Sequence, residues 1–145
     1  MTNRSLTIAA GLALCGLAAC DERPTEPALV VVEQGQVAFG GDETACLQRA
    51  YGRNEDADED GESHVWTVEA AEGSCMHFPL VLGVQPDGAA DMSGSARLTP
   101  NDHFHFETGT ADRRFVADFR QASGNDIFYV RDRDGNWTDI RRAQQ

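Results

Sequence analysis

Most of this chain follows a hydrophobic pattern with a period of two, which is typical of strands that bury one face. The clearest case is 114–120, where Phe115, Ala117 and Phe119 would point to one side and charged residues mostly to the other. The remaining segments that are rich in β-branched or aromatic residues are 28–32, 36–39, 65–68, 75–84, 103–106, 127–130 and 137–140.

The turn-forming residues between these segments predict how they connect. Asp134-Gly135 lies between 127–130 and 137–140 and favours a tight type I′ turn, which predicts a hairpin. Turn signals recur about every ten residues, as in an antiparallel meander of about seven or eight strands. Because so little of the chain is helical, the sheet must bury its apolar side against another sheet or by curling on itself. The expected fold class is mainly β, a small antiparallel meander closing as a barrel or sandwich.

One short segment has a helical spacing instead. Apolar residues between 46 and 51 would share one face of a helix, with Asp42 or Thr44 as its cap and Gly52 as its stop. We therefore expect one short helix near the N-terminus, ending at about Tyr51.

The N-terminal segment has the layout of a cleaved secretory signal. Arg4 precedes a continuously apolar or small run at 6–14, and the apolar segment is shorter than the roughly 20 residues that a membrane-spanning helix needs. Its end, Leu17-Ala18-Ala19-Cys20, resembles the lipobox of bacterial lipoproteins. That resemblance implies cleavage before Cys20 and attachment of lipid, including a palmitate-type acyl chain, to the Cys20 thiol.

The lipobox divides the chain into three parts. Residues 1–19 would be the cleaved signal peptide, 20–27 a lipidated tether rich in proline and charge, and 28–145 a single β-rich domain. Asp21 after the lipidated cysteine resembles the signal that retains lipoproteins in the inner membrane of enteric bacteria, and Glu22 fits the same pattern. We expect the periplasmic face of the inner membrane, with the outer membrane as the alternative.

The net charge of the chain restricts the classes of partner that it is expected to bind. Twelve basic and 24 acidic residues give a net charge of −12, and loss of Arg4 with the signal leaves 11 against 24, or −13. Such a surface repels phosphate backbones, so nucleic acid is not an expected partner. Residues 111–145 hold seven of the arginines and six acidic residues, which indicates cross-strand ion pairs or, alternatively, a docking surface for an acidic partner or lipid headgroup.

Cys46 and Cys75 are the only cysteines left after removal of Cys15 with the signal and acylation of Cys20. Export would place them in an oxidising compartment, where a disulfide is the ordinary state of such a pair.

An acidic run resembles half of a calcium-binding loop. Asp56, Asp58 and Asp60 alternate before Gly61, so three carboxylates could converge on one Ca²⁺ while the glycine permits a sharp turn. The bidentate glutamate of an EF-hand is missing, because Thr67 stands at its position. The alternative is a solvated acidic loop.

A second candidate metal site lies on a predicted strand. His103, His105 and Glu107 would project from the same face, and two imidazoles with a carboxylate can bind zinc or another transition metal. The alternative is a strand with an aromatic core face and a polar outer face.

Another local resemblance concerns 93–109. Ser93-Gly94-Ser95-Ala96-Arg97 and the aromatic strand after it are similar to a stretch of the bacterial lipoprotein lysozyme inhibitors. This likeness implies a small lipid-anchored β-barrel that occupies a lysozyme cleft, with Ser93 and Arg97 in contact with the enzyme.

None of the usual catalytic motifs is present: there is no Gly-x-Ser-x-Gly elbow, phosphate-binding glycine loop, dinucleotide fingerprint or His-Glu-x-x-His. The sequence therefore predicts a non-enzymatic envelope lipoprotein with no required cofactor, anchored to the membrane by its lipid and bound to an envelope protein partner. A calcium- or transition-metal-binding module and a hydrolase inhibitor are the alternatives.

Overall fold

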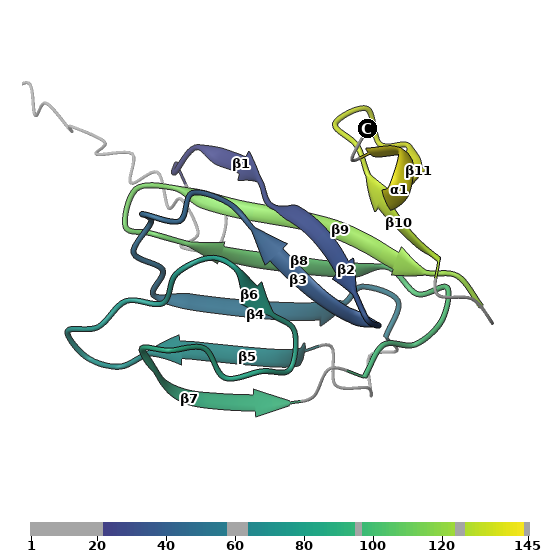
Figure 1. Ribbon diagram of the computed structural model, residues 1–145. Coiled ribbons are helices and arrows are strands. Elements are labelled where there is room, and N and C mark those ends of the chain that lie inside the picture. Colours follow the sequence, from purple (N-terminus) through teal and green to yellow (C-terminus); the bar gives the residue numbers. More distant parts are fainter. Residues whose placement is uncertain (1–21, 58–63, 95–96, 124–126, 144–145) are drawn as a thin grey trace, which may run out of the picture.

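The computed structural model describes residues 22–57, 64–94, 97–123 and 127–143, and it shows two antiparallel sheets in face-to-face layers (Figure 1). The larger sheet has the order β11-β10-β9-β8-β4-β5-β7, and β1 pairs in parallel with β9 beside β10. The smaller sheet has the order β2-β3-β6. The elements are β1 (Thr25–Pro27), β2 (Leu29–Glu33), β3 (Gln36–Gly40), β4 (Arg49–Asn54), β5 (His64–Ala70), β6 (Leu80–Val81), β7 (Ala89–Gly94), β8 (Phe104–Gly109), β9 (Arg114–Gln121), β10 (Phe128–Arg131), β11 (Trp137–Asp139) and α1 (Ile140–Ala143).

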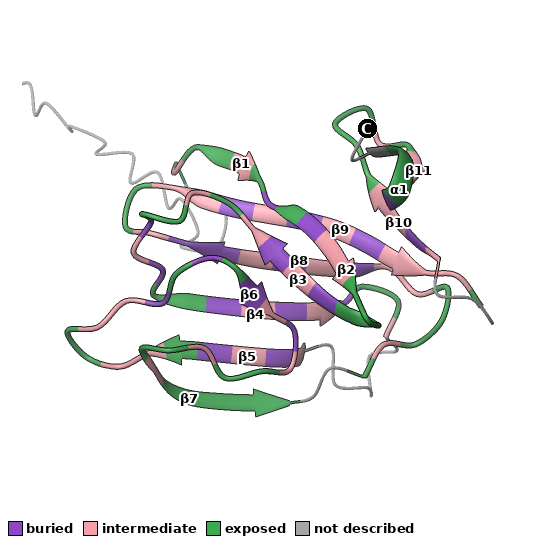
Figure 2. Ribbon diagram, viewed as in Figure 1, coloured by how far each residue is buried: buried purple, intermediate pink, exposed green. Residues whose placement is uncertain are grey.

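The core lies between the two sheets and is dominated by aromatic rings. Phe39 of β3 stacks on Phe106 of β8 with ring centroids 3.7 Å apart, and Phe78 meets Phe115 of β9 edge-on at 5.1 Å. We call the side of the larger sheet that faces these contacts its inner face and the opposite side its outer face. Burial alternates along β8 and β9 accordingly (Figure 2). The larger sheet does not close on itself, so the expected mainly β class is confirmed in a sandwich-like form and not as a barrel.

The expected N-terminal helix is wrong. Arg49–Asn54 form β4, which pairs with β5 on one side and β8 on the other. Asp42 accepts hydrogen bonds from the Thr44 backbone and hydroxyl in a short turn, and not as the cap of a helix. Pairing on both sides of β4 outweighs the helical spacing of the apolar residues at 46–51 and its weak helical preference. The short helix that forms, α1, lies near the C-terminus.

The predicted C-terminal hairpin is confirmed, with a different turn. β10 and β11 pair antiparallel, from Tyr129 opposite Asp139 to Arg131 opposite Trp137. A type I′ turn needs two consecutive positive φ angles, but of the Asp134-Gly135 dipeptide only Gly135, at 84°, has one. The Asp132 carboxylate instead accepts the backbone N–H groups of Asp134 and Asn136 and closes a longer loop.

Part of the segment expected to be a tether lies in the sheet. Thr25–Pro27 pair with β9 as β1, and Arg114 N donates to Pro24 O at 2.9 Å. Within the described residues, no helix is long and apolar enough to cross a membrane.

Candidate functional site

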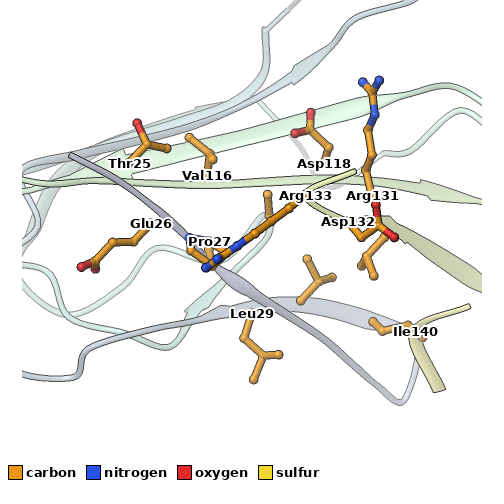
Figure 3. Close-up of a pocket in the computed structure, with 14 residues that line it drawn as sticks. Thr25, Glu26, Pro27, Leu29, Val116, Asp118, Arg131, Asp132, Arg133 and Ile140 are labelled. Carbon is orange, nitrogen blue, oxygen red and sulfur yellow. The ribbon is translucent and has the colours of Figure 1, made fainter. Parts of the chain in front are cut away.

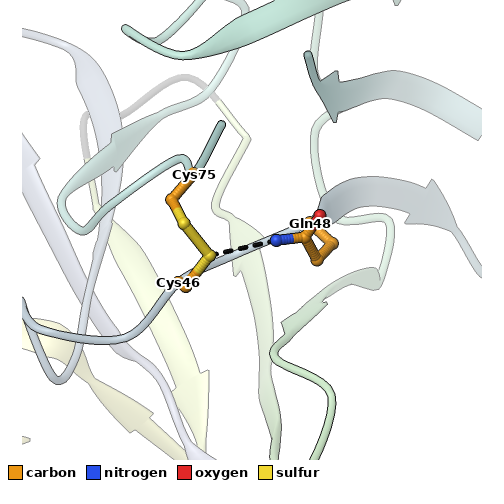
Figure 4. The surroundings of a disulfide bond; sticks show 3 residues. All are labelled: Cys46, Gln48 and Cys75. Carbon is orange, nitrogen blue, oxygen red and sulfur yellow. Dashed lines mark hydrogen bonds between the residues drawn. A yellow bond between two sulfur atoms is a disulfide. The ribbon is translucent and has the colours of Figure 1, made fainter. Parts of the chain in front are cut away.

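Cys46 and Cys75 form a disulfide with their Cα atoms 4.9 Å apart, which confirms the predicted pairing (Figure 4). The neighbouring residues Leu47 and Met76 are joined by an isolated antiparallel bridge, so backbone and disulfide bind the same two segments. Gln48 Nε2 lies 3.0 Å from Cys46 Sγ. The bond joins the segment before β4 to the segment before β6. The two cysteines are 29 residues apart in the sequence.

The outer face of β4, β8 and β9 carries a continuous series of hydrogen-bonded polar side chains. The strand register creates it, because Tyr51 lies opposite Glu107, and His105 lies opposite Asp118. Side chains directly opposite on one face of a sheet are close enough to interact. We call the six linked side chains the polar chain: Arg114, Glu107, Tyr51, His105, Asp118 and His103.

Glu107 accepts hydrogen bonds at one end of the polar chain. Tyr51 Oη donates to its Oε2 at 2.7 Å, and Arg114 Nε donates to its Oε1 at 2.9 Å. Burial favours the neutral acid, but the hydrogen bonds from Arg114, Tyr51 and a neighbouring histidine outweigh it and lower the pKa of Glu107. Burial, followed by the hydrogen bond to Glu107, raises the pKa of Tyr51 to about 12. Glu107 is therefore ionised and Tyr51 neutral at neutral pH.

His105 connects two carboxylates. Asp118 Oδ1 lies 3.0 Å from His105 Nδ1 and 2.7 Å from His103 Nε2, while His105 Nε2 lies 3.3 Å from Glu107 Oε2. Because ionised carboxylates only accept, these contacts require a proton on both ring nitrogens of His105. The hydrogen bond to Asp118 raises the pKa of His105 against the opposing effect of burial. Burial favours neutral Asp118, but the hydrogen bonds from the two histidines outweigh it and lower its pKa.

An arginine held between aromatic rings adjoins the polar chain. The Arg120 guanidinium carbon lies 4.8 Å from the Trp137 ring centroid and 5.4 Å from that of Tyr129, within the range of cation–π attraction. Trp137 also meets the His103 ring edge-on at 5.3 Å, which joins the two groups. Among the described residues, no carboxylate forms an ion pair with Arg120. We call Arg120, Tyr129 and Trp137 the Arg120 cluster.

Two hollows border this face. One, of about 390 Å³, has Tyr51 and Glu107 in its wall together with Arg23 and Arg49. It brings solvent to the Glu107 end of the polar chain.

The other hollow is a groove of about 520 Å³ along the edge of β9, where β1–β2 and β10 diverge. Leu29, Val116 and Ile140 form apolar parts of its wall, and Asp118 of the polar chain lines it too (Figure 3). A molecule in this groove would lie beside the carboxylate that joins the two histidines.

His103, His105 and Glu107 lie together on the outer face, where the alternating pattern places them. Their polar atoms are directed to Asp118, Arg114 and Tyr51. In the parts of the chain that the structure describes, no group of three or more histidine, cysteine, aspartate or glutamate side chains is arranged to hold a metal ion.

The acidic calcium candidate is described only in part. Asp56 Oδ2 accepts the backbone N–H of His103 at 2.7 Å, and Asp56 N donates to Asn54 Oδ1 at 2.9 Å, so this carboxylate ties the end of β4 to the start of β8. Asp58 and Asp60 lie outside the described residues, as does the lipidation candidate Cys20.

Ser93 and Arg97 lie away from the polar chain. Ser93 is exposed on β7, opposite Thr67 of β5, and β7 is an edge strand separated from β8 by β5 and β4. Arg97 is exposed beyond the end of β7. Ser95 and Ala96, which belong to the same local resemblance, lie outside the described residues.

Sequence reasoning missed half of the polar chain. The alternation at 114–120 already placed Arg114, Asp118 and Arg120 opposite the phenylalanines. Their partners depend on the pairing of β8 with β9 and of β4 with β8, which no local pattern contains. The helical spacing at 46–51 predicts a helix that ends at about Tyr51, and a residue of that helix would not lie opposite Glu107.

Comparisons with protein families, with characterised proteins and with solved structures find no match to this chain. The arguments on function therefore depend on the residues and geometry described above.

Proposed function

We propose that this protein is a membrane-anchored envelope lipoprotein whose β domain binds another envelope protein and has no catalytic role. The lipobox ending at Cys20 supports the anchor, with acylation worth about 0.8 kcal/mol per buried methylene. The Cys46–Cys75 disulfide supports export, because such bonds persist in oxidising compartments. Asp21 favours the periplasmic face of the inner membrane, with the outer membrane as the alternative.

The observation that carries the binding role is the partly exposed outer face of β8–β11. It presents the polar chain and the Arg120 cluster side by side, joined by the contact of His103 with Trp137. Tyrosine, tryptophan and arginine are the residue types most enriched where binding energy concentrates in interfaces. Side chains already fixed by mutual contacts lose little entropy when a partner binds.

The electrostatics of this face favour binding over catalysis. A general acid or base works best with a pKa near the operating pH. Hydrogen bonds lower the pKa values of Glu107 and Asp118, which moves both carboxyl groups further from neutral pH and holds them ionised. These groups are suited to fixed charge and hydrogen bonding, and the proposal requires no cofactor.

Photocrosslinking in intact cells tests the binding role. A photoreactive residue at Tyr129, on the outer face, should yield a discrete protein adduct. The same residue at Glu33, exposed at the end of β2, is the matched control and should not yield it. Arg120→Ala in the Tyr129 background should remove the adduct. The same adducts from both positions, or persistence in the Arg120 variant, would contradict the proposed interface.

The anchor has its own test. Intact mass of the protein extracted from membranes should show a chain that begins at Cys20 and carries acyl groups, while Cys20→Ala should abolish both processing and lipid. An unmodified chain beginning at Met1 would remove the lipoprotein part of the proposal and leave the crosslinking result to be judged separately.

A further inference from the structure

Contacts that join the N-terminal segment to the domain lie very close in sequence to the proposed lipid anchor. Arg23 Nη1 donates to Thr110 O at 2.9 Å, and Arg114 N donates to Pro24 O. Arg113 lies 3.5 Å from Glu26 across the same junction. These contacts fasten the chain from Arg23 onward to one end of the larger sheet. We call this end, formed by the turn at 109–114 between β8 and β9, the turn end; it lies at the left in Figure 1.

Chain length then limits how far the turn end can be from the lipid. Three peptide units separate Cys20 from Arg23, and a fully extended chain spans at most about 3.6 Å per residue, so the reach is about 11 Å. A tether of eight residues, as the sequence alone suggested, would have reached more than twice as far.

We infer that the domain stands directly on the bilayer, with its turn end against the lipid headgroups; this rests on the lipid anchor of the proposed function. β9 begins at the turn end, and its eight residues rise about 26 Å at about 3.3 Å each. The outer face is therefore confined to a layer within about 40 Å of the headgroups. The partner it fits is a protein that exposes its binding surface in that layer of the same membrane.

Charge does not hold the turn end at the membrane. Arg23, Arg49, Arg113 and Arg114 lie there, but Arg49 is 3.5 Å from Glu69, Arg113 is paired with Asp42 at 2.8 Å, and Arg114 is paired with Glu107 at 2.9 Å. The nearby acidic groups include Glu22, Glu26, Asp42, Glu43, Glu69 and Asp112. An end with more acids than arginines gains nothing from anionic headgroups. The covalent tether is what keeps it close, so the placement should be insensitive to salt.

Fluorescence quenching by lipid headgroups tests the placement. The lipoprotein is extracted and reconstituted in phosphatidylcholine vesicles that contain a lipid with a nitroxide on its headgroup. A fluorophore is attached to Ala111→Cys at the turn end or to Ser123→Cys beyond the far end of β9; both positions are exposed. With Cys46 and Cys75 paired and Cys20 acylated, the introduced thiol is the single reactive one.

Quenching should be several-fold stronger at position 111 than at 123, and high salt should not change the ratio. Insertion of about 15 Gly/Ser residues between Glu22 and Arg23 should equalise the two positions, because such a linker reaches about 20 Å on average. Equal quenching at the two positions in the acylated protein without the inserted linker would overturn the placement but not the proposed anchor. A ratio that falls with salt would overturn the covalent explanation. A Cys20 without lipid in the mass spectrum would overturn the proposed anchor and the placement together.

Discussion

The two faces of β8 and β9 are built from alternate residues of the same strands, yet they differ in burial and in what they contribute to stability. On the inner face, Phe106 is fully buried against Phe39 of the smaller sheet, and Phe115 is almost completely buried against Phe78, which lies just before β6. On the outer face, the side chains of His105 and Asp118 are 17% and 27% exposed to solvent, and they form an ion pair with each other. Burial of apolar area stabilises a fold strongly, whereas ion pairs that remain partly exposed to solvent contribute little net free energy. The comparison indicates that the inner face holds the fold and the outer face holds a charge pattern in place.

The largest effect should come from the inner face. Phe106→Ala removes a fully buried ring that stacks on Phe39 and should lower the free energy of unfolding by about 4 kcal/mol, measured by urea denaturation. If this variant does not fold, Phe106→Leu should lose about 1 to 2 kcal/mol. A loss no greater than that of any outer-face variant would remove the distinction between the faces.

The neighbouring outer position should have a smaller effect. Glu107→Ala leaves the donors of Tyr51 and Arg114 without their acceptor and should cost about 1 to 2 kcal/mol in the same assay. Glu107→Gln keeps one carbonyl acceptor and should cost less. A loss near zero in Glu107→Ala would mean that the hydrogen bonds of Glu107 do not stabilise the fold.

His105 should make stability depend on pH. Its pKa is raised in the folded protein, so its contribution is full below its unfolded pKa of about 6.5 and is lost as pH rises through the folded pKa. Asp118 has a lowered pKa in the folded protein and matters at acidic pH. Its contribution to stability is lost as pH falls through its folded pKa. His105→Gln should therefore lose about 1 kcal/mol at about pH 6 and less at about pH 9. A loss that is constant or grows with pH would contradict an imidazolium at this position.

The smallest effect on stability should come from the Arg120 cluster. Arg120→Ala removes two cation–π contacts at a partly exposed site and should change the free energy of unfolding by less than about 1 kcal/mol. Fluorescence of Trp137 should nevertheless change, because the guanidinium leaves its ring. Arg120→Lys, which keeps the charge and loses the planar group, serves as the control. A loss comparable to that of Phe106→Ala would show that the cluster is part of the core.

The local sequence pattern was sufficient to predict where most strands lie but insufficient to predict which strands pair with each other. The alternation of Phe115, Ala117 and Phe119 predicted β9 and the face it buries, and the arithmetic of the cysteines predicted the bond between Cys46 and Cys75. The polar chain could not be predicted whole, because it depends on the register that sets His105 opposite Asp118.

The prediction of a helix at the start of β4 is wrong for a related reason. A spacing of three and four between apolar residues at 46–51 fits a helix, but long-range pairing with β5 and β8 makes 49–54 a central strand. Strand preference is decided largely by such neighbours, which a single segment does not reveal. The junction of Arg23 and Pro24 with the turn end is likewise a contact across more than 80 residues of sequence.

Nitrogen-detected NMR of the histidine side chains, followed as a function of pH, tests most directly whether the outer face is fixed in advance of binding. The free protein should show His105 with protons on both ring nitrogens at neutral pH, and its titration midpoint should lie above the ordinary value of about 6.5. A His105 ring that is neutral at pH 7, with a midpoint at or below that value, would contradict the polar chain.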